Sequence, residues 1–146
     1  MVLVYFSRFY FFDTGVARSI AHMNVPTETM TEYGTLFETY IAMELVAYID
    51  YAGLHNTELT YYRTNDGKRE VDFILSDEVA IEVKSAKKVT DKHLANLREL
   101  KEEGIFSQFI VVSREESLRM LEDGILVFPW KNFLDRLWNG KIIAKK

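Results

Sequence analysis

The stretch VDFILSDEVAIEVKSAKK, residues 71–88, places charged side chains inside two apolar runs that are typical of strands. Asp72 lies in the first run, and Glu82 and Lys84 lie in the second. Acids and lysines are rarely taken into a protein interior unless they are paired or bind a ligand. These three charges therefore constrain both the sheet that contains them and the kind of site that the sheet can carry.

The hydrophobic pattern predicts a helix, three strands, a helix and a strand as the central part of the fold. The expected elements are a strand or linker over 1–12, a short helix from Asp13 or Thr14 to about His22, a loop over 23–34, a helix over 35–52, strands over 58–64, 69–75 and 79–85, a helix over 90–104, strands over 106–113 and 125–128, and a helix opened by Pro129. The turn NDG makes the first two strands a hairpin. A mixed sheet with a helix on each face buries these apolar stripes, so the sequence predicts an α/β fold.

Length and composition indicate one globular domain over residues 1–146, with 48% hydrophobic and 27% charged residues. The absence of cysteine excludes a disulfide framework and a thiolate metal site, which favours the cytoplasm. The net charge of −4 excludes a global basic footprint, so any contact with DNA needs a local patch. The apolar opening MVLVYFSRFYFF is too short to span a bilayer and lacks signal-peptide features. We therefore expect no membrane partner and interpret this opening as a packed strand or linker. So apolar an opening also suggests that the sequence is a piece of a longer chain.

Alternation along a strand puts Glu82 and Lys84 on one face, with Cα atoms roughly 7 Å apart. If the strand of Asp72 pairs with theirs, Asp72 and Glu82 converge at one sheet edge. Two close carboxylates repel unless a cation compensates, and Mg²⁺ accepts one or two carboxylates together with waters. A nearby lysine can stabilise charge on phosphoryl oxygens. The pattern is thus compatible with a Mg²⁺ or Mn²⁺ site, and also with an exposed ion pair.

Glu38 lies between Leu45 and Ile49 in an apolar sector of the helix expected over 35–52, so it needs a partner. One interpretation is a capping box, in which Glu38 bonds back to the N–H of Thr35. The other is an acid that reaches the metal site. Glu44 is a second acid in an apolar sector and an alternative candidate.

The segments FYFFDTGVAR, LFETYIAMEL, YYRTNDGKREVDFIL, IEVKSAKK and ILVFPW together resemble a bacterial and archaeal domain of unknown function that follows the P-loop module of AAA-type ATPases. The order of a helix with Glu, a strand with Asp and a strand with Glu-x-Lys is similar to the PD-(D/E)XK, or restriction-endonuclease-like, phosphodiesterases. The likeness runs from about Arg8 to Trp138. It implies a restriction-endonuclease-like αβββαβ core, a Mg²⁺-dependent DNA endonuclease activity, and an N-terminal ATPase module as partner.

By this resemblance, Asp72 and Glu82 are metal-binding acids, Lys84 is the catalytic lysine, and Glu38 is the helix-borne acid. Val71 stands where the name of the superfamily has proline. The sequence contains no G-x-x-x-x-G-K-[ST], so ATP would bind only to the ATPase module. Because many members of this superfold have lost their chemistry, the alternative is an inactive module that binds DNA or docks the ATPase.

A dense basic cluster follows the Glu-x-Lys motif and consists of Lys84, Lys87, Lys88, Lys92 and His93. Lys87, Lys88 and Lys92 are the predicted contacts to a phosphate backbone. The alternative is a solvent-exposed start of the next helix, where Asp91 reduces the net positive charge.

Two further features have an ordinary and a functional interpretation. Arg63, Lys68 and Arg69 flank the hairpin turn, where charges are common, and they would otherwise extend the basic cluster. The apolar stripe from Trp130 to Trp138 is predicted to be core. Its alternative is a docking face for the ATPase module or for a second copy in a homo-oligomer, as in a purely structural assembly domain.

Overall fold

The computed structural model describes residues 15, 31–54 and 57–144. The predicted strand or linker over 1–12, the short helix ending at His22, most of the loop over 23–34 and the side chain of His55 lie outside the described residues. The described elements are α2 (Thr31–Tyr51), β1 (Leu59–Arg63), β2 (Glu70–Leu75), β3 (Val79–Lys84), α3 (Asp91–Glu102), β4 (Gln108–Ser113), β5 (Arg119–Met120), β6 (Leu126–Pro129) and α4 (Trp130–Trp138).

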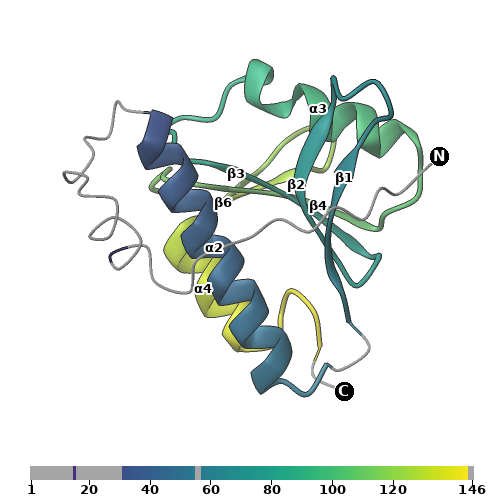
Figure 1. Ribbon diagram of the computed structural model, residues 1–146. Coiled ribbons are helices and arrows are strands. Elements are labelled where there is room, and N and C mark those ends of the chain that lie inside the picture. The colour runs from purple at the N-terminus through teal and green to yellow at the C-terminus, as the bar shows by residue number, and fades with distance from the viewer. Residues whose placement is uncertain (1–14, 16–30, 55–56, 145–146) are drawn as a thin grey trace.

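The six strands form one mixed sheet in the order β1-β2-β3-β4-β6-β5 (Figure 1). Strands β1, β2 and β3 pair antiparallel, whereas β4 pairs parallel with both β3 and β6. A parallel pair needs a crossover connection, and α3 provides it between β3 and β4. Helix α3 covers one face of the sheet, and α2 and α4 lie side by side on the other (Figure 1). The prediction of a mixed α/β fold with helices on both faces is therefore confirmed.

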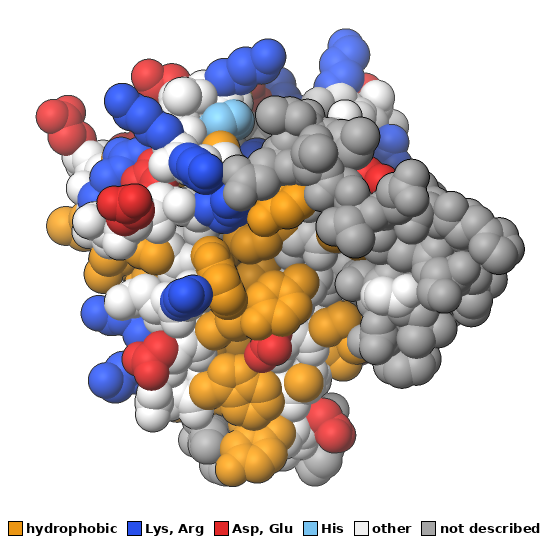
Figure 2. Space-filling model, turned by 90° about the vertical axis from the view of Figure 1, so that its left-hand side faces the viewer, with side chains coloured by type: hydrophobic (Ala, Val, Ile, Leu, Met, Phe, Trp, Pro, Cys, Tyr) orange, Lys and Arg blue, Asp and Glu red, His pale blue; other side chains and the backbone are white. Residues whose placement is uncertain are grey.

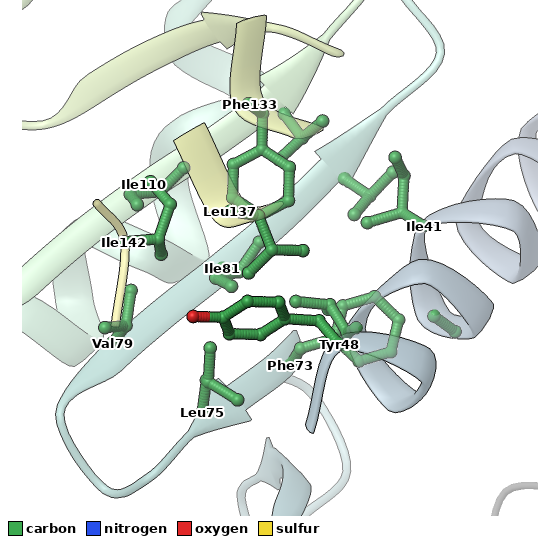
Figure 3. Close-up of a cluster of buried hydrophobic side chains, with 14 of the residues drawn as sticks. Ile41, Tyr48, Phe73, Leu75, Val79, Ile81, Ile110, Phe133, Leu137 and Ile142 are labelled. Carbon is green, nitrogen blue, oxygen red and sulfur yellow. The ribbon is translucent and has the colours of Figure 1, made fainter. Parts of the chain in front are cut away.

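The apolar core has two parts because the sheet is covered on both faces. Figure 3 shows the part under α2 and α4, in which Tyr48 and Phe133 meet strand residues such as Ile81 and Ile110. The part under α3 contains its three buried leucines, Leu94, Leu97 and Leu100. Burial of the strands on both faces explains why the sequence of β4 is almost uniformly apolar.

Helix α2 begins at least four residues earlier than the sequence predicts, so the predicted loop is wrong over residues 31–34. Gly34 normally disfavours a helix interior by about 1 kcal/mol. A Cβ at this position would lie 3.5 Å from Oγ of Ser85, an ordinary van der Waals distance, so the helix passes near the end of β3 without requiring glycine there. The helix therefore continues through Gly34 despite the unfavourable local preference.

Most other predicted boundaries differ from the observed ones by only one or two residues. The two-residue strand β5 has no hydrophobic pattern of its own and was not predicted. Pro129 ends β6 and precedes the first turn of α4, as predicted. None of the helices in the described ranges has both the length and the hydropathy needed to cross a membrane.

We expect the substitution Phe133→Ala to lower the free energy of unfolding by about 3–5 kcal/mol, because it leaves a cavity in the core under α2 and α4. Urea denaturation followed by circular dichroism measures this change. Val46→Ala is the matched control, since Val46 is 47% exposed and its change should stay within about 0.5 kcal/mol. Equal effects of the two substitutions would contradict the packing described for Phe133.

Candidate functional site

A register shift on β2 sets the direction of the Asp72 side chain. Between the pairs Thr60–Ile74 and Tyr62–Val71, one residue of β1 lies opposite two residues of β2. Asp72 is one of these two, so β2 carries a β-bulge at the candidate site. Bulges of this kind redirect a side chain and interrupt regular pairing.

The Asp72 carboxylate accepts a hydrogen bond that a backbone carbonyl would accept in a regular ladder. The pairing of β2 with β3 ends at Phe73–Ile81, and beyond it Oδ2 of Asp72 accepts a hydrogen bond of 2.8 Å from the N–H of Val83. The carboxylate is therefore held between the two strands where their regular pairing stops. A hydrogen bond to a charged acceptor restricts its orientation.

Glu82 lies on β3, between β2 and β4, and is only 3% exposed. Nζ of Lys84 lies 2.5 Å from its Oε1. Its other oxygen, Oε2, is buried and has no hydrogen-bond partner among the described residues. Buried polar atoms without partners are rare in native proteins, and such an atom on a carboxylate is a candidate position for a cation or a proton.

This burial affects the pKa values of Glu82 and Lys84. Burial, with the nearby Asp72 carboxylate, raises the pKa of Glu82 from its ordinary value of 4.5 to about 7, although Lys84 acts in the opposite direction. Burial also disfavours the charged form of Lys84, but Glu82, Asp72 and Glu38 together raise its pKa. The ammonium of Lys84 therefore stays charged, whereas the charge on Glu82 is only partly compensated.

Glu38 acts on the site by raising the pKa of Lys84. The interpretation that Glu38 forms a capping box with Thr35 is wrong. Helix α2 extends from Thr31, so Thr35 lies inside it, and the Thr35 carbonyl accepts a hydrogen bond of 2.8 Å from the Thr39 hydroxyl. Glu38 is half-buried and close enough to raise the pKa of Lys84. Across residues 31–54 and 57–144, however, no three or more His, Cys, Asp or Glu side chains form a group that could hold a metal ion. The predicted metal site thus has two carboxylates, Asp72 and Glu82, with Glu38 as a neighbour of the lysine.

Glu44 does not belong to this site. Its Oε2 accepts a hydrogen bond of 2.8 Å from Nε1 of Trp138, and the Tyr40 hydroxyl also bonds to its carboxylate. Tyr40 and Trp130 form an edge-to-face pair with ring centroids 5.8 Å apart. Glu44 therefore joins α2 to α4. Figure 2 shows a band of hydrophobic side chains along one side of the molecule.

The residues of the basic cluster have different positions. Lys87 and Lys88 are exposed on the loop between β3 and α3 and line a cleft of about 810 Å³. Lys92 is exposed on α3 but does not line the cleft. His93 caps α3: its Nδ1 accepts a hydrogen bond of 3.2 Å from the N–H of Thr90. Figure 2 shows Lys and Arg side chains gathered near a histidine at the upper end of this face.

Several residues of the cleft were not predicted from the sequence, among them Arg114, Glu115 and Arg119. They follow β4 and carry no local motif, so only the pairing of β4 with β3 brings them beside the loop over 85–90. The spacing of Thr90 and His93, in contrast, is that of a capping box and was available as a signal.

The charges near the hairpin turn have local partners. Nε of Arg69 lies 2.5 Å from Oε2 of Glu99, and Nζ of Lys68 lies 3.6 Å from Oδ2 of Asp66. In α4, Phe133 is buried and Trp130 and Trp138 pack against the same core, so the prediction that this stripe is core is confirmed.

Residues 33–133 of the chain match the protein family described as Domain of unknown function (DUF4143). The match includes Glu38, Asp72, Glu82 and Lys84, and the loops on both sides of the cleft. No curated protein and no solved structure matches the chain.

Without divalent cations, we expect the stability difference between Glu82→Gln and the wild type to change with pH. Because the pKa of Glu82 is higher in the folded than in the unfolded state, its contribution is fully present below pH 4.5 and is lost as the pH rises through about 7. The wild type should therefore lose about 3 kcal/mol relative to the Gln variant between pH 4.5 and 8. Urea unfolding at several pH values measures this difference.

The control for this experiment is Glu116→Gln, because Glu116 is exposed to solvent in the folded state as well. Its difference from the wild type should stay nearly constant over the same range. A constant difference for Glu82→Gln would mean that the carboxylate of Glu82 is not buried as described.

Proposed function

This chain belongs to the family described as Domain of unknown function (DUF4143), and we propose from its geometry that it is a Mg²⁺-dependent nuclease domain that hydrolyses phosphodiester bonds in DNA. One observation carries this proposal. A buried carboxylate, Glu82, has one oxygen paired with Lys84 and the other without a partner among the described residues, and it lies beside the carboxylate of Asp72.

The residues fit a small divalent cation. Mg²⁺ binds oxygen ligands and uses one or two carboxylates while keeping several waters, so Asp72 and Glu82 suffice to hold it. The unpartnered Oε2 of Glu82 and the raised pKa of this group both indicate a place where positive charge is missing. When bound, the ion would polarise the phosphodiester and activate a water for attack on phosphorus.

The side chains of the chain itself would position and stabilise the reacting groups. The Lys84 ammonium, held by Glu82, can donate a hydrogen bond to a non-bridging phosphate oxygen as negative charge develops there. Glu38 and Asp72 help to keep this ammonium protonated, since both raise its pKa. The hydrogen bond from the Val83 N–H fixes the orientation of the Asp72 carboxylate before any substrate arrives.

The order of elements supports a restriction-endonuclease-like core. Helix α2, strands β1 to β3, helix α3 and strand β4 follow each other as in an αβββαβ arrangement. Because this family follows AAA ATPase modules, we also propose that such a module of the same protein delivers the DNA and binds the ATP.

A catalytically inactive module that binds DNA or docks the ATPase is the second candidate. The observation that favours it is that the described residues provide no group of three acidic or histidine ligands for a metal ion. Two carboxylates hold an ion less firmly than three, so the fold would keep the shape of the site and a reduced affinity for the ion.

We expect Asp72→Asn and Lys84→Met each to lower cleavage of plasmid or branched DNA, with Mg²⁺ or Mn²⁺ present, by a factor on the order of 100 or more, since each removes a charge that acts on the reacting phosphate. Gel electrophoresis of the products measures the rate. The matched controls are Asp77→Asn, at an exposed turn position with φ of 54° that Asn tolerates, and Lys101→Met on α3. Equal cleavage by the wild type and both site variants would exclude these residues from the mechanism.

Calorimetric titration with Mn²⁺ separates the two candidates. A nuclease should bind Mn²⁺, and Asp72→Asn and Glu82→Gln should abolish that binding. Retained DNA affinity without Mn²⁺ binding and without cleavage would instead identify the domain as an inactive module.

A further inference from the structure

The cleft of about 810 Å³ lies at the edge of the sheet where two parallel strands end. Lys84 of β3 pairs with Ser113 of β4, so the loops that follow both strands leave the sheet side by side. These loops and the first turns of α3 form the walls of the cleft. Ligands of open α/β sheets bind outside the carboxyl ends of parallel strands, which is where this cleft opens.

The lining of the cleft is basic, although the whole chain has a net charge of −4. The charged residues that line it are the cations Lys87, Lys88, Arg98, Arg114 and Arg119 and the acids Asp91, Glu115 and Glu116. The guanidinium of Arg114 lies 5.1 Å from the ring centroid of Tyr33, which holds this cation at the wall that follows β4. Arg98 is paired with Asp91 and Asp123, and Arg119 is paired with Glu115. The excess positive charge over Glu116 therefore comes from Lys87, Lys88 and Arg114 on two loops, which favours a polyanionic ligand.

A partly buried ion pair joins the two walls. The side chain of Glu115 is only 10% exposed, and Arg119 donates hydrogen bonds of 2.8 and 2.9 Å to its two oxygens. The N–H of Val89, in the opposite wall, donates a bond of 2.6 Å to the same carboxylate, and Arg119 donates to the Val89 carbonyl. The backbone N–H of Arg114 also donates to the carbonyl of Ala86. These bonds hold the walls in place, so a ligand would not have to order them.

We propose that this cleft binds the phosphate backbone of the DNA substrate, one or more nucleotides away from the phosphodiester that lies at Asp72 and Glu82. The inference rests on the proposed function, because that function identifies the polyanion as DNA. Lys87 and Lys88 from one wall and Arg114 from the other would contact successive phosphates. The N-terminus of α3, which lines the cleft at Thr90, adds a favourable dipole. Contacts of this kind position the duplex without reading its sequence.

The test measures binding of fluorescein-labelled duplex DNA by anisotropy at several KCl concentrations, in EDTA so that no hydrolysis occurs. For the double substitution Lys87→Gln and Lys88→Gln, we expect an affinity about 10-fold lower at low salt. A plot of the logarithm of the binding constant against the logarithm of the salt concentration has a negative slope. For this variant the slope should become less steep by roughly 1 to 2. The matched control is Lys101→Gln with Lys141→Gln, which makes the same change in net charge outside the cleft. Arg114→Gln should lower the affinity in the same direction as the cleft variant.

The outcomes separate this inference from the proposed function. If the cleft variant and the control bind with equal affinity and slope, the cleft assignment is overturned, even when cleavage still depends on Asp72 and Lys84. If the cleft variant alone loses affinity and neither the wild type nor any variant cleaves DNA, the cleft assignment is supported and hydrolysis is overturned. If inorganic polyphosphate of similar length binds the wild type as tightly as DNA does, the assignment to nucleic acid is overturned.

Discussion

The burial of a carboxylate in the middle of the sheet is the constraint on which the arrangement of this domain depends. Glu82 lies on the inner strand β3 of a sheet that is packed on both faces, and its side chain is buried. The neighbouring side chains of β3 are apolar and contribute to both cores. A charge at such a position is destabilising unless it is compensated, and Lys84 compensates it only in part. The cation that we propose at Asp72 and Glu82 would compensate this charge, and its binding would in turn stabilise the fold.

The regular features of the sheet are interrupted at the same place. The bulge on β2 and the bond from the Val83 N–H to Asp72 both lie where the pairing of β2 and β3 ends. Sequences that specify a fold agree with local rules almost everywhere, and the exceptions concentrate at functional sites. Here a bulge, a backbone donor that bonds to a side chain and a carboxylate oxygen without a partner in the described part of the chain occur within a few residues of one another. These three features together distinguish this part of β2 and β3 from a regular strand pair.

The sequence predicts the elements of this fold well because their signals are local: helical spacing in α3 and α4, apolar runs in β3 and β4, and the turn between β1 and β2. It predicts Asp72, Glu82 and Lys84 as neighbours because a hairpin and strand alternation are enough to bring them together. What it misses depends on distant contacts. The partner of Glu44 is Trp138, and the bond between Glu115 and Val89 requires that β3 and β4 be paired. Without the start of α2, the spacing of Thr35 and Glu38 was indistinguishable from a capping box.

Helices α2 and α4 cover the same face of the sheet, although more than ninety residues separate the partners that join them, such as Glu44 and Trp138. The hydroxyl of Tyr48 likewise donates to the carbonyl of Ile143. During translation, α2 and β1 to β3 therefore emerge from the ribosome long before α4 can protect their apolar side chains. Until then the nascent chain presents an uncovered sheet face to its surroundings, and such faces are the surfaces on which chains aggregate or chaperones bind. This half of the core can therefore close only once α4 has been synthesised and packs beside α2.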